Sequence, residues 1–264
     1  EDILFSAQSR FEVQFLRKET VKGIKEELSF YRIVRELPEF LNSYQRQYQD
    51  KEQVSYQSET ADIIKKIEEK KINQVLIAGE HGTGKSFLSW QILSRFYAAD
   101  QKIAILVLDE FNRHDPLILH RKFISNAMEL SDPLAEPEKV KAYIMETLEE
   151  RDAEILFSAL GLQNQSTAIT DDSGKKIDLL LSSLQNSLNR LMQNYDLVLL
   201  DNIQWLDDLS VQILQKRLEE ESIKPQTLIL TTTEMPAVYQ AKANANTVFL
   251  QLQNLTQDEV FMLI

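Results

Sequence analysis

The chain has 264 residues, of which 43% are hydrophobic and 27% charged, a composition typical of a water-soluble globular protein with a sizeable core. Its formal net charge of −12 argues against a surface that coats nucleic acid or anionic membrane, so nucleic acid is not an expected partner. Without cysteine the chain has no disulfide or thiolate metal site, and without a long apolar run or a signal peptide we expect it in the cytoplasm.

The N-terminal region contains a turn signal followed by a β-favouring run. Lys22-Gly23 provides a glycine that can adopt a left-handed conformation, and "LSFYRIV" follows at 28–34. The pattern V-K-G-I followed by Y-R-I resembles the closing strand pair of class III nucleotide cyclase domains. Its matching residues are Val21, Lys22, Gly23, Ile24, Tyr31 and Ile33. The resemblance implies that residues 1–40 are the tail of an upstream cyclase-like domain and that cyclase activity is not contained in this chain. The alternative is an ordinary β-hairpin or a helix that caps the next domain.

Residues 41–58 are polar and rich in Gln and Tyr, which indicates a linker or an exposed helix. A core domain is expected over 59–264, beginning with a charged amphipathic helix at 59–71. Short apolar runs then alternate with helical patterns, and we predict strands at 74–78, 102–108, 197–200, 227–232 and 247–252. Continuous Val/Ile/Leu runs are typical of strands covered on both faces. The prediction is therefore an α/β fold with a doubly wound, mostly parallel sheet.

Helical periodicity fills the intervals between these strands. The patterns predict helices at 85–100 and at 208–222, the second with Asp208 or Ser210 as its N-cap. Between the second and third strands, 111–194 forms a long insertion. It has helical patterns at 136–160 and 175–194, joined by a loop at 164–176. We interpret the insertion as a helical excursion from the sheet, the alternative being a separate domain.

The strongest motif is "GEHGTGKS", which fits G-x-x-x-x-G-K-[ST] and lies between a predicted strand and a predicted helix. Glycines allow the backbone to fold around phosphate oxygens, Lys85 can reach the β- and γ-phosphates, and the Ser86 hydroxyl can ligate Mg²⁺. A chance match is the alternative, but three of the chain's six glycines lie in this loop. The predicted nucleotide-binding residues are Gly79, Glu80, His81, Gly82, Thr83, Gly84, Lys85, Ser86 and Phe87.

An acid at the end of a later strand completes the pattern. Asp201 directly follows "LVLL" and, with Ser86, is the predicted metal-binding pair, so the expected cofactors are ATP and Mg²⁺. A turn residue would explain an isolated Asp equally well. The segment "LVLLDNIQWLDDLSVQIL" resembles the Walker B region of the STAND class of signal-transduction ATPases, relatives of the AAA+ proteins. Asp201, Gln204, Trp205 and Asp207 match, and Asn202 stands in place of the second acid.

The resemblance covers about residues 54–264 and implies further roles. "LQLQNLTQDEVFMLI" resembles the family's passage to a lid helix, so we expect a fragment of a larger protein that ends before the lid. Thr232 matches a polar sensor position, although Glu234 stands where relatives often carry Arg; the alternative is a β-favouring Thr at a strand end. Arg217 is the nearest positional match to an arginine finger, the alternative being a solvated helix charge. The predicted catalytic residues are Lys85, Asp201, Asn202 and Thr232.

These features predict a regulatory nucleotide-binding module of a multidomain signalling protein. An amide at 202 cannot accept a proton from water, so we expect slow ATP hydrolysis coupled to conformational switching or self-association with a protein partner. Candidate substitute acids are Asp207, Asp208, Asp109 and Glu110. The alternative is that Trp205 and Asp207 serve packing and the start of the next helix, whereas Asp109 and Glu110 end a different strand. The alternative from another class is an AAA+ nucleic-acid loader or transposition-type regulator. A small-molecule kinase with the same loop fits the long insertion poorly.

Overall fold

In the computed structural model, the described residues are 11–20, 27–36, 56–97, 101–130, 132–162, 173–219, 226–234 and 246–254. The chain divides into two compact units, Glu1–Gln53 and Val54–Ile264. Each unit is described by itself below.

The described part of the first unit is an antiparallel strand pair, β1 (Phe11–Thr20) and β2 (Glu27–Glu36). Phe15 lies opposite Tyr31, with the two rings in an edge-to-face contact at 5.5 Å between centroids. On this pair the Arg17 guanidinium lies 5.9 Å from the centre of the Phe30 ring. The helix alternative for these residues is therefore wrong, whereas the Lys22-Gly23 turn lies outside the described residues. The cyclase-like interpretation stays a prediction.

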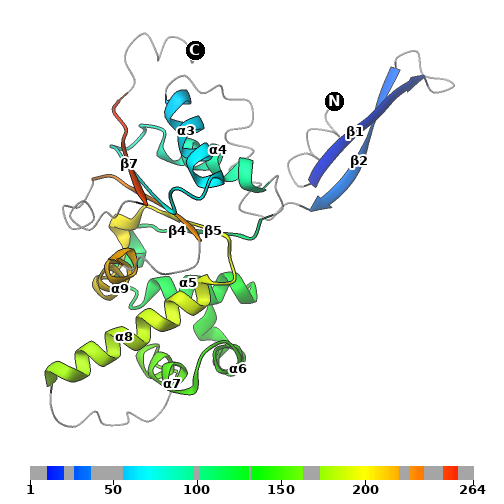
Figure 1. Cartoon of the computed structure of the whole chain (residues 1–264). Helices are drawn as coiled ribbons and strands as arrows, with labels where there is room; N and C mark the ends of the chain where they lie inside the picture. Colours follow the sequence, from blue (N-terminus) through cyan, green and yellow to red (C-terminus); the bar gives the residue numbers. More distant parts are fainter. Residues whose placement is uncertain are drawn as a thin grey trace. The chain divides into compact units, whose positions relative to one another are not determined.

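The second unit contains a five-stranded parallel sheet in the order β4-β5-β6-β3-β7 (Figure 1). Its strands are β3 (Gln74–Ala78), β4 (Ile103–Val107), β5 (Leu197–Asp201), β6 (Thr227–Thr232) and β7 (Thr247–Gln251). All five predicted strands are confirmed, and β5 extends one residue further than predicted because Asp201 belongs to it. In this order β6 separates β3 from β5, so both of its neighbours carry predicted site residues at their ends.

Helices cover both faces of this sheet, which confirms the doubly wound prediction. The α3 helix (Gln57–Glu68) and the α4 helix (Lys85–Tyr97) lie on one face, and the α9 helix (Asp208–Glu219) lies on the other with the inserted helices (Figure 1). Every residue of β3, β5 and β6 is buried, as two-sided covering requires. The continuous apolar runs in the sequence follow from this position.

The α9 helix has a different N-cap from the one predicted. The Asp207 carboxylate accepts hydrogen bonds from the N–H groups of Leu209 and Ser210, both at 3.1 Å. Asp207 is therefore the capping residue, whereas Asp208 is the first helical residue. The prediction of Asp208 or Ser210 was wrong by one or three positions.

The insertion between β4 and β5 is helical, as predicted. It consists of η1 (Glu110–His114), α5 (Ile118–Met128), η2 (Pro133–Ala135), α6 (Pro137–Thr147), α7 (Glu150–Ala159) and α8 (Ser173–Met192). The single pattern at 136–160 is two helices, because Leu148 adopts an extended conformation between α6 and α7. Helix α8 begins inside the predicted loop 164–176, so that boundary was wrong. Within the described ranges, no helix combines the length and apolarity needed to span a bilayer.

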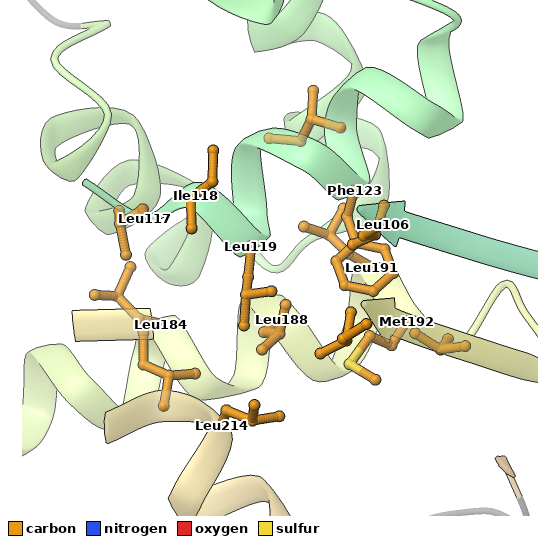
Figure 2. Packing of buried hydrophobic residues seen from close by; sticks show 14 of the residues in the cluster. Leu106, Leu117, Ile118, Leu119, Phe123, Leu184, Leu188, Leu191, Met192 and Leu214 are labelled. Atoms are coloured by element: carbon orange, nitrogen blue, oxygen red, sulfur yellow. The ribbon is translucent and has the colours of Figure 1, made fainter. Parts of the chain in front are cut away.

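The insertion and the sheet share one hydrophobic core. Figure 2 shows Leu184, Leu188 and Leu191 of α8 packed near Leu119 of α5 and Leu214 of α9. The same buried cluster continues into alternate residues of β4, β5 and β6, whose side chains point to this face. A helical excursion that completes the core of the sheet is therefore confirmed over a separate domain.

Candidate functional site

The glycine-rich loop connects β3 to α4 and needs its glycines for two different reasons. Gly82 and Gly84 have φ angles of +83° and +92°, a region in which a side chain is strained. Gly79 is needed for close packing instead, since a Cβ there would lie 2.6 Å from Thr83 Oγ1 and 3.0 Å from Leu252 Cβ. The loop conformation therefore depends on all three glycines of the motif.

Lys85 is the first residue of α4 and points back over the loop. Its ammonium donates to the carbonyl oxygens of Gly79 at 2.6 Å and Glu80 at 2.8 Å, and the side chain is buried. Burial lowers the pKa of Lys85, and the carboxylate of Asp201 acts in the opposite direction. An ammonium has three N–H donors, so two neutral carbonyls leave it able to bind an anion at the same edge.

Ser86 and Asp201 meet although 115 residues separate them. The Ser86 hydroxyl donates to Asp201 Oδ2 at 3.4 Å, which places the end of β5 beside the start of α4. A hydroxyl and a carboxylate oxygen are the hard oxygen ligands that Mg²⁺ prefers, so the pair fits the predicted cation. Within the described ranges no group of three or more His, Cys, Asp or Glu residues could hold a metal by itself. A cation here would therefore complete its shell with phosphate and water oxygens.

Asn202 forms a left-handed turn directly after β5, with φ 65° and ψ 51°. Among non-glycine residues, Asn is one of the few enriched in this conformation. Its backbone N–H donates to Thr231 Oγ1 at 2.9 Å, and its side-chain amide donates to the Leu108 carbonyl at 3.4 Å. Gln204 Nε2 lies 3.5 Å from the Asn202 side-chain oxygen. The backbone of Asn202 is thus bonded to the end of β6, and its side chain to the residue that follows β4.

The two threonines at the end of β6 have different surroundings. Thr232, the predicted sensor, donates its hydroxyl to the Glu234 carbonyl at 2.8 Å, and its own carbonyl accepts the Gly79 N–H at 3.2 Å. Thr231 instead donates to Asp201 Oδ1 and accepts from Asn202. Sequence reasoning missed Thr231, because which of two adjacent strand residues faces Asp201 depends on the strand register.

The β3-loop-α4 unit and the strand-end acid two strands away define the fold class of the second unit. The fold is that of a P-loop NTPase. No protein-family model matches the sequence, and no curated protein matches it either.

Several solved structures resemble the chain distantly. A DNA replication initiation factor matches at 12% identity and TM-score 0.40, covering 78% of this chain and 48% of its own. Pif1 helicase from Candida albicans matches at 9% and 0.35, covering 76% and 40%. cbiO1 from Clostridium perfringens, part of the ABC transporter complex cbiONQ, matches at 15% and 0.33, covering 72% and 79%. The matched region spans about half or less of the first two proteins, and we draw no functional conclusion from likenesses this distant.

Of the four acids that could replace a base at position 202, two cap helices and two lie exposed at the first positions of helices. Asp207 is buried and, besides capping α9, accepts the Ile118 N–H at the start of α5 at 3.1 Å. Asp109 caps η1 by accepting from Phe111 at 2.9 Å and Asn112 at 3.3 Å. Asp207 therefore serves the start of α9, as expected, and both carboxylates accept hydrogen bonds from backbone N–H groups. Asp208 and Glu110 are exposed first residues of their helices.

Arg217 does not fit either sequence interpretation. It lies on α9 and only 4% of it is exposed. A solvated helix charge is therefore wrong, and a guanidinium enclosed in its own domain does not reach a neighbouring subunit as a finger. Trp205, in η3 (Ile203–Trp205), is half-buried and packs against the shared core.

The residues after β7 contact the end of β3 and the glycine-rich loop. The Leu252 N–H donates to the Ala78 carbonyl at 2.7 Å, and Asn254 Nδ2 donates to Glu80 Oε2 at 3.1 Å. The Gln253 N–H donates to the hydroxyl of Tyr56, the residue before α3, at 2.8 Å. The two remaining predicted binding residues lie nearby in the chain: His81 is exposed in the loop, and Phe87 stacks on Trp90 along α4 at 6.1 Å.

Proposed function

We propose that the second unit is an ATP- and Mg²⁺-binding regulatory module that hydrolyses ATP slowly. The observation that carries the proposal is the meeting of Ser86 and Asp201 across 3.4 Å, beside a loop whose lysine lies over its edge. A hydroxyl, a carboxylate and an ammonium gathered at one edge of the sheet match the needs of a Mg²⁺-bound triphosphate. Glycines in the loop allow phosphates to approach the backbone closely.

In this proposal each side chain has a distinct role in binding. Lys85 exchanges its hydrogen bonds to the Gly79 and Glu80 carbonyls for oxygens of ionised phosphates, which accept more strongly. Ser86 and Asp201 hold the cation. When bound, Mg²⁺ neutralises charge on the phosphates.

Slow hydrolysis follows from the residues around Asn202. A general base contributes about 10²–10⁴-fold to a rate, and an amide cannot accept the proton of an attacking water. The nearby carboxylates of Asp207 and Asp109 are engaged as helix caps and do not replace it. A long-lived ATP state suits a module whose bound nucleotide controls a conformational switch or self-association within a multidomain signalling protein.

The binding step is tested with a fluorescent ATP analogue titrated in Mg²⁺. Lys85→Ala should weaken binding by about tenfold or more, because a charge-assisted hydrogen bond contributes roughly 1.5–3 kcal/mol. The matched control is Lys71→Ala, a lysine that is exposed and paired with Glu69. A wild-type protein that binds no ATP analogue, or a Lys85→Ala variant that binds it as tightly as Lys71→Ala, would refute the proposal.

A second measurement separates the regulatory role from the nucleic-acid alternative. If ATP and Mg²⁺ cause self-association, the particle mass measured by light scattering should rise when they are added. If they cause a conformational switch, the pattern of amide exchange should change. Nucleic-acid binding would instead appear as ATP-dependent association with DNA or RNA whose affinity falls steeply with salt, because phosphate contacts release counterions. That outcome would replace the signalling role with the loader role.

A further inference from the structure

Thr231 connects the two residues at the end of β5. Its side chain is fully buried, its hydroxyl donates to Asp201 Oδ1, and its oxygen accepts the Asn202 N–H at 2.9 Å. A hydroxyl has a single proton to donate. The Thr231 proton is therefore committed to the strand-end carboxylate, and its oxygen to the turn that follows.

The contact divides the two oxygens of Asp201. Oδ1 faces Thr231, whereas Oδ2 faces the Ser86 hydroxyl at 3.4 Å. A hydrogen bond to one oxygen of a carboxylate restricts rotation of the group and so fixes the direction of the other. The direction of Asp201 Oδ2 toward the loop thus depends on a residue of a different strand.

Thr231 also holds a backbone conformation that is costly without support. Asn202 is left-handed at φ 65°, and residues in such conformations persist only where their surroundings fix them. The Asn202 N–H is bonded to Thr231, and its side-chain amide is bonded to Leu108 of the neighbouring chain segment. One hydroxyl therefore orients the carboxylate and supports the turn after it.

We propose that Thr231 is a positioning residue for the cation-binding edge of this site. Because Thr231 fixes Asp201 and Asn202 together, Mg²⁺ strengthens nucleotide binding. Without the Thr231 hydroxyl, Mg²⁺ no longer strengthens nucleotide binding. The adjacent Thr232 has no such role, because its hydroxyl is bonded to the Glu234 carbonyl of its own segment. The inference rests on the proposed function, since it assigns a role within the same site.

The test compares three variants for binding of the fluorescent ATP analogue in Mg²⁺ and in EDTA. Thr231→Val keeps the shape but removes the hydroxyl, and Thr231→Ser keeps the hydroxyl. Thr227→Val, a buried threonine at the other end of β6, is the matched control. Thr231→Val should weaken binding in Mg²⁺ by about 10- to 100-fold, the loss typical when a partner of a metal-binding group is removed. Its affinity in EDTA should equal that of the wild type, and the other two variants should bind as the wild type does in both conditions.

Different failures have different meanings. If the wild type binds no nucleotide in either condition, the proposed function fails. If the wild type binds more tightly in Mg²⁺ and Thr231→Val does the same, the positioning role alone is overturned. Equal losses in Mg²⁺ and EDTA, or a Thr231→Ser variant as weak as Thr231→Val, also overturn it, because they indicate a general structural role.

A measurement on the wild type remains decisive if Thr231→Val does not fold. Amide exchange at Asn202, followed by NMR, should be slow because its N–H is bonded to a buried hydroxyl. Thr231→Ala, which adds no methyl group in place of the hydroxyl, should fold and exchange faster at Asn202. Rapid exchange at Asn202 in the wild type would refute the hydrogen bond from its N–H to the Thr231 hydroxyl.

Discussion

At the scale of single residues, the structure around Asn202 favours an asparagine for two reasons. Its left-handed backbone favours Asn over most other side chains, and its amide bonds to the Leu108 carbonyl. The absence of a second acid after Asp201 therefore has a structural cause besides any catalytic one. The effect of a Glu at position 202 on turnover must therefore be compared with that of an Asp, which the left-handed turn tolerates better.

We expect Asn202→Glu to raise ATP turnover, because it supplies a group that can accept a proton from water. The variant should also lose roughly 1 kcal/mol of stability, since Glu disfavours the left-handed region. Asn202→Asp is tolerated in the turn and should lose less stability, because its cost is limited to the hydrogen bond that a carboxylate cannot donate to Leu108. Its gain in turnover should be smaller, because its carboxylate is one methylene shorter. Phosphate release at saturating ATP and urea unfolding check the two effects. Two variants that bind ATP but turn it over no faster than the wild type would exclude water activation as the limiting step.

At the scale of elements, the sequence predicts what depends on local pattern. The five strands follow from continuous apolar runs, and the loop at Gly79 to Ser86 follows from its motif and its place between strand and helix. The α6–α7 break was missed because apolar periodicity continues through Leu148, where only the backbone becomes extended. Local pattern therefore finds elements more reliably than their ends.

Contacts between distant elements were not predictable in the same way. The pairing of Thr231 with Asp201 requires the register of β5 against β6, in which Leu199 lies opposite Ile229. The double capping role of Asp207 requires α5 and α9 to begin at the same place, although 90 residues separate their first residues, Ile118 and Asp208. Neither relation leaves a periodic signal in a single sequence.

The Asp207 cap joins two helices, and its loss should affect both. We expect Asp207→Ala to lower the free energy of unfolding by about 2–4 kcal/mol, because it removes two caps and leaves buried N–H groups without a partner. The matched control is Asp208→Ala, whose carboxylate is exposed at the first position of α9 and interacts with the helix dipole, so its loss should cost less than about 1 kcal/mol. Urea unfolding of both variants measures the difference. Equal losses would contradict the double cap.

At the scale of the whole molecule, the insertion and the sheet of the second unit should unfold together because they share one core. His120 of α5 lies inside that core, fully buried, and its Nε2–H donates to the Leu184 carbonyl of α8 at 2.9 Å. Burial lowers the pKa of His120 to about 4, while the Leu184 carbonyl and the Asp207 carboxylate act in the opposite direction. The native protein therefore holds this imidazole neutral.

The lowered pKa predicts a pH-dependent stability. Unfolded histidine has a pKa of about 6.5, so between that value and about 4 the unfolded chain binds a proton that the folded protein does not. The His120 contribution to stability is complete above pH 6.5 and is lost as the pH falls toward 4, which amounts to about 2 kcal/mol at pH 5. Urea unfolding between pH 7.5 and 5 should show this loss in the wild type and in His81→Gln, an exposed control, but not in His120→Gln. A His120→Gln variant that keeps the full pH dependence would show that other groups cause it.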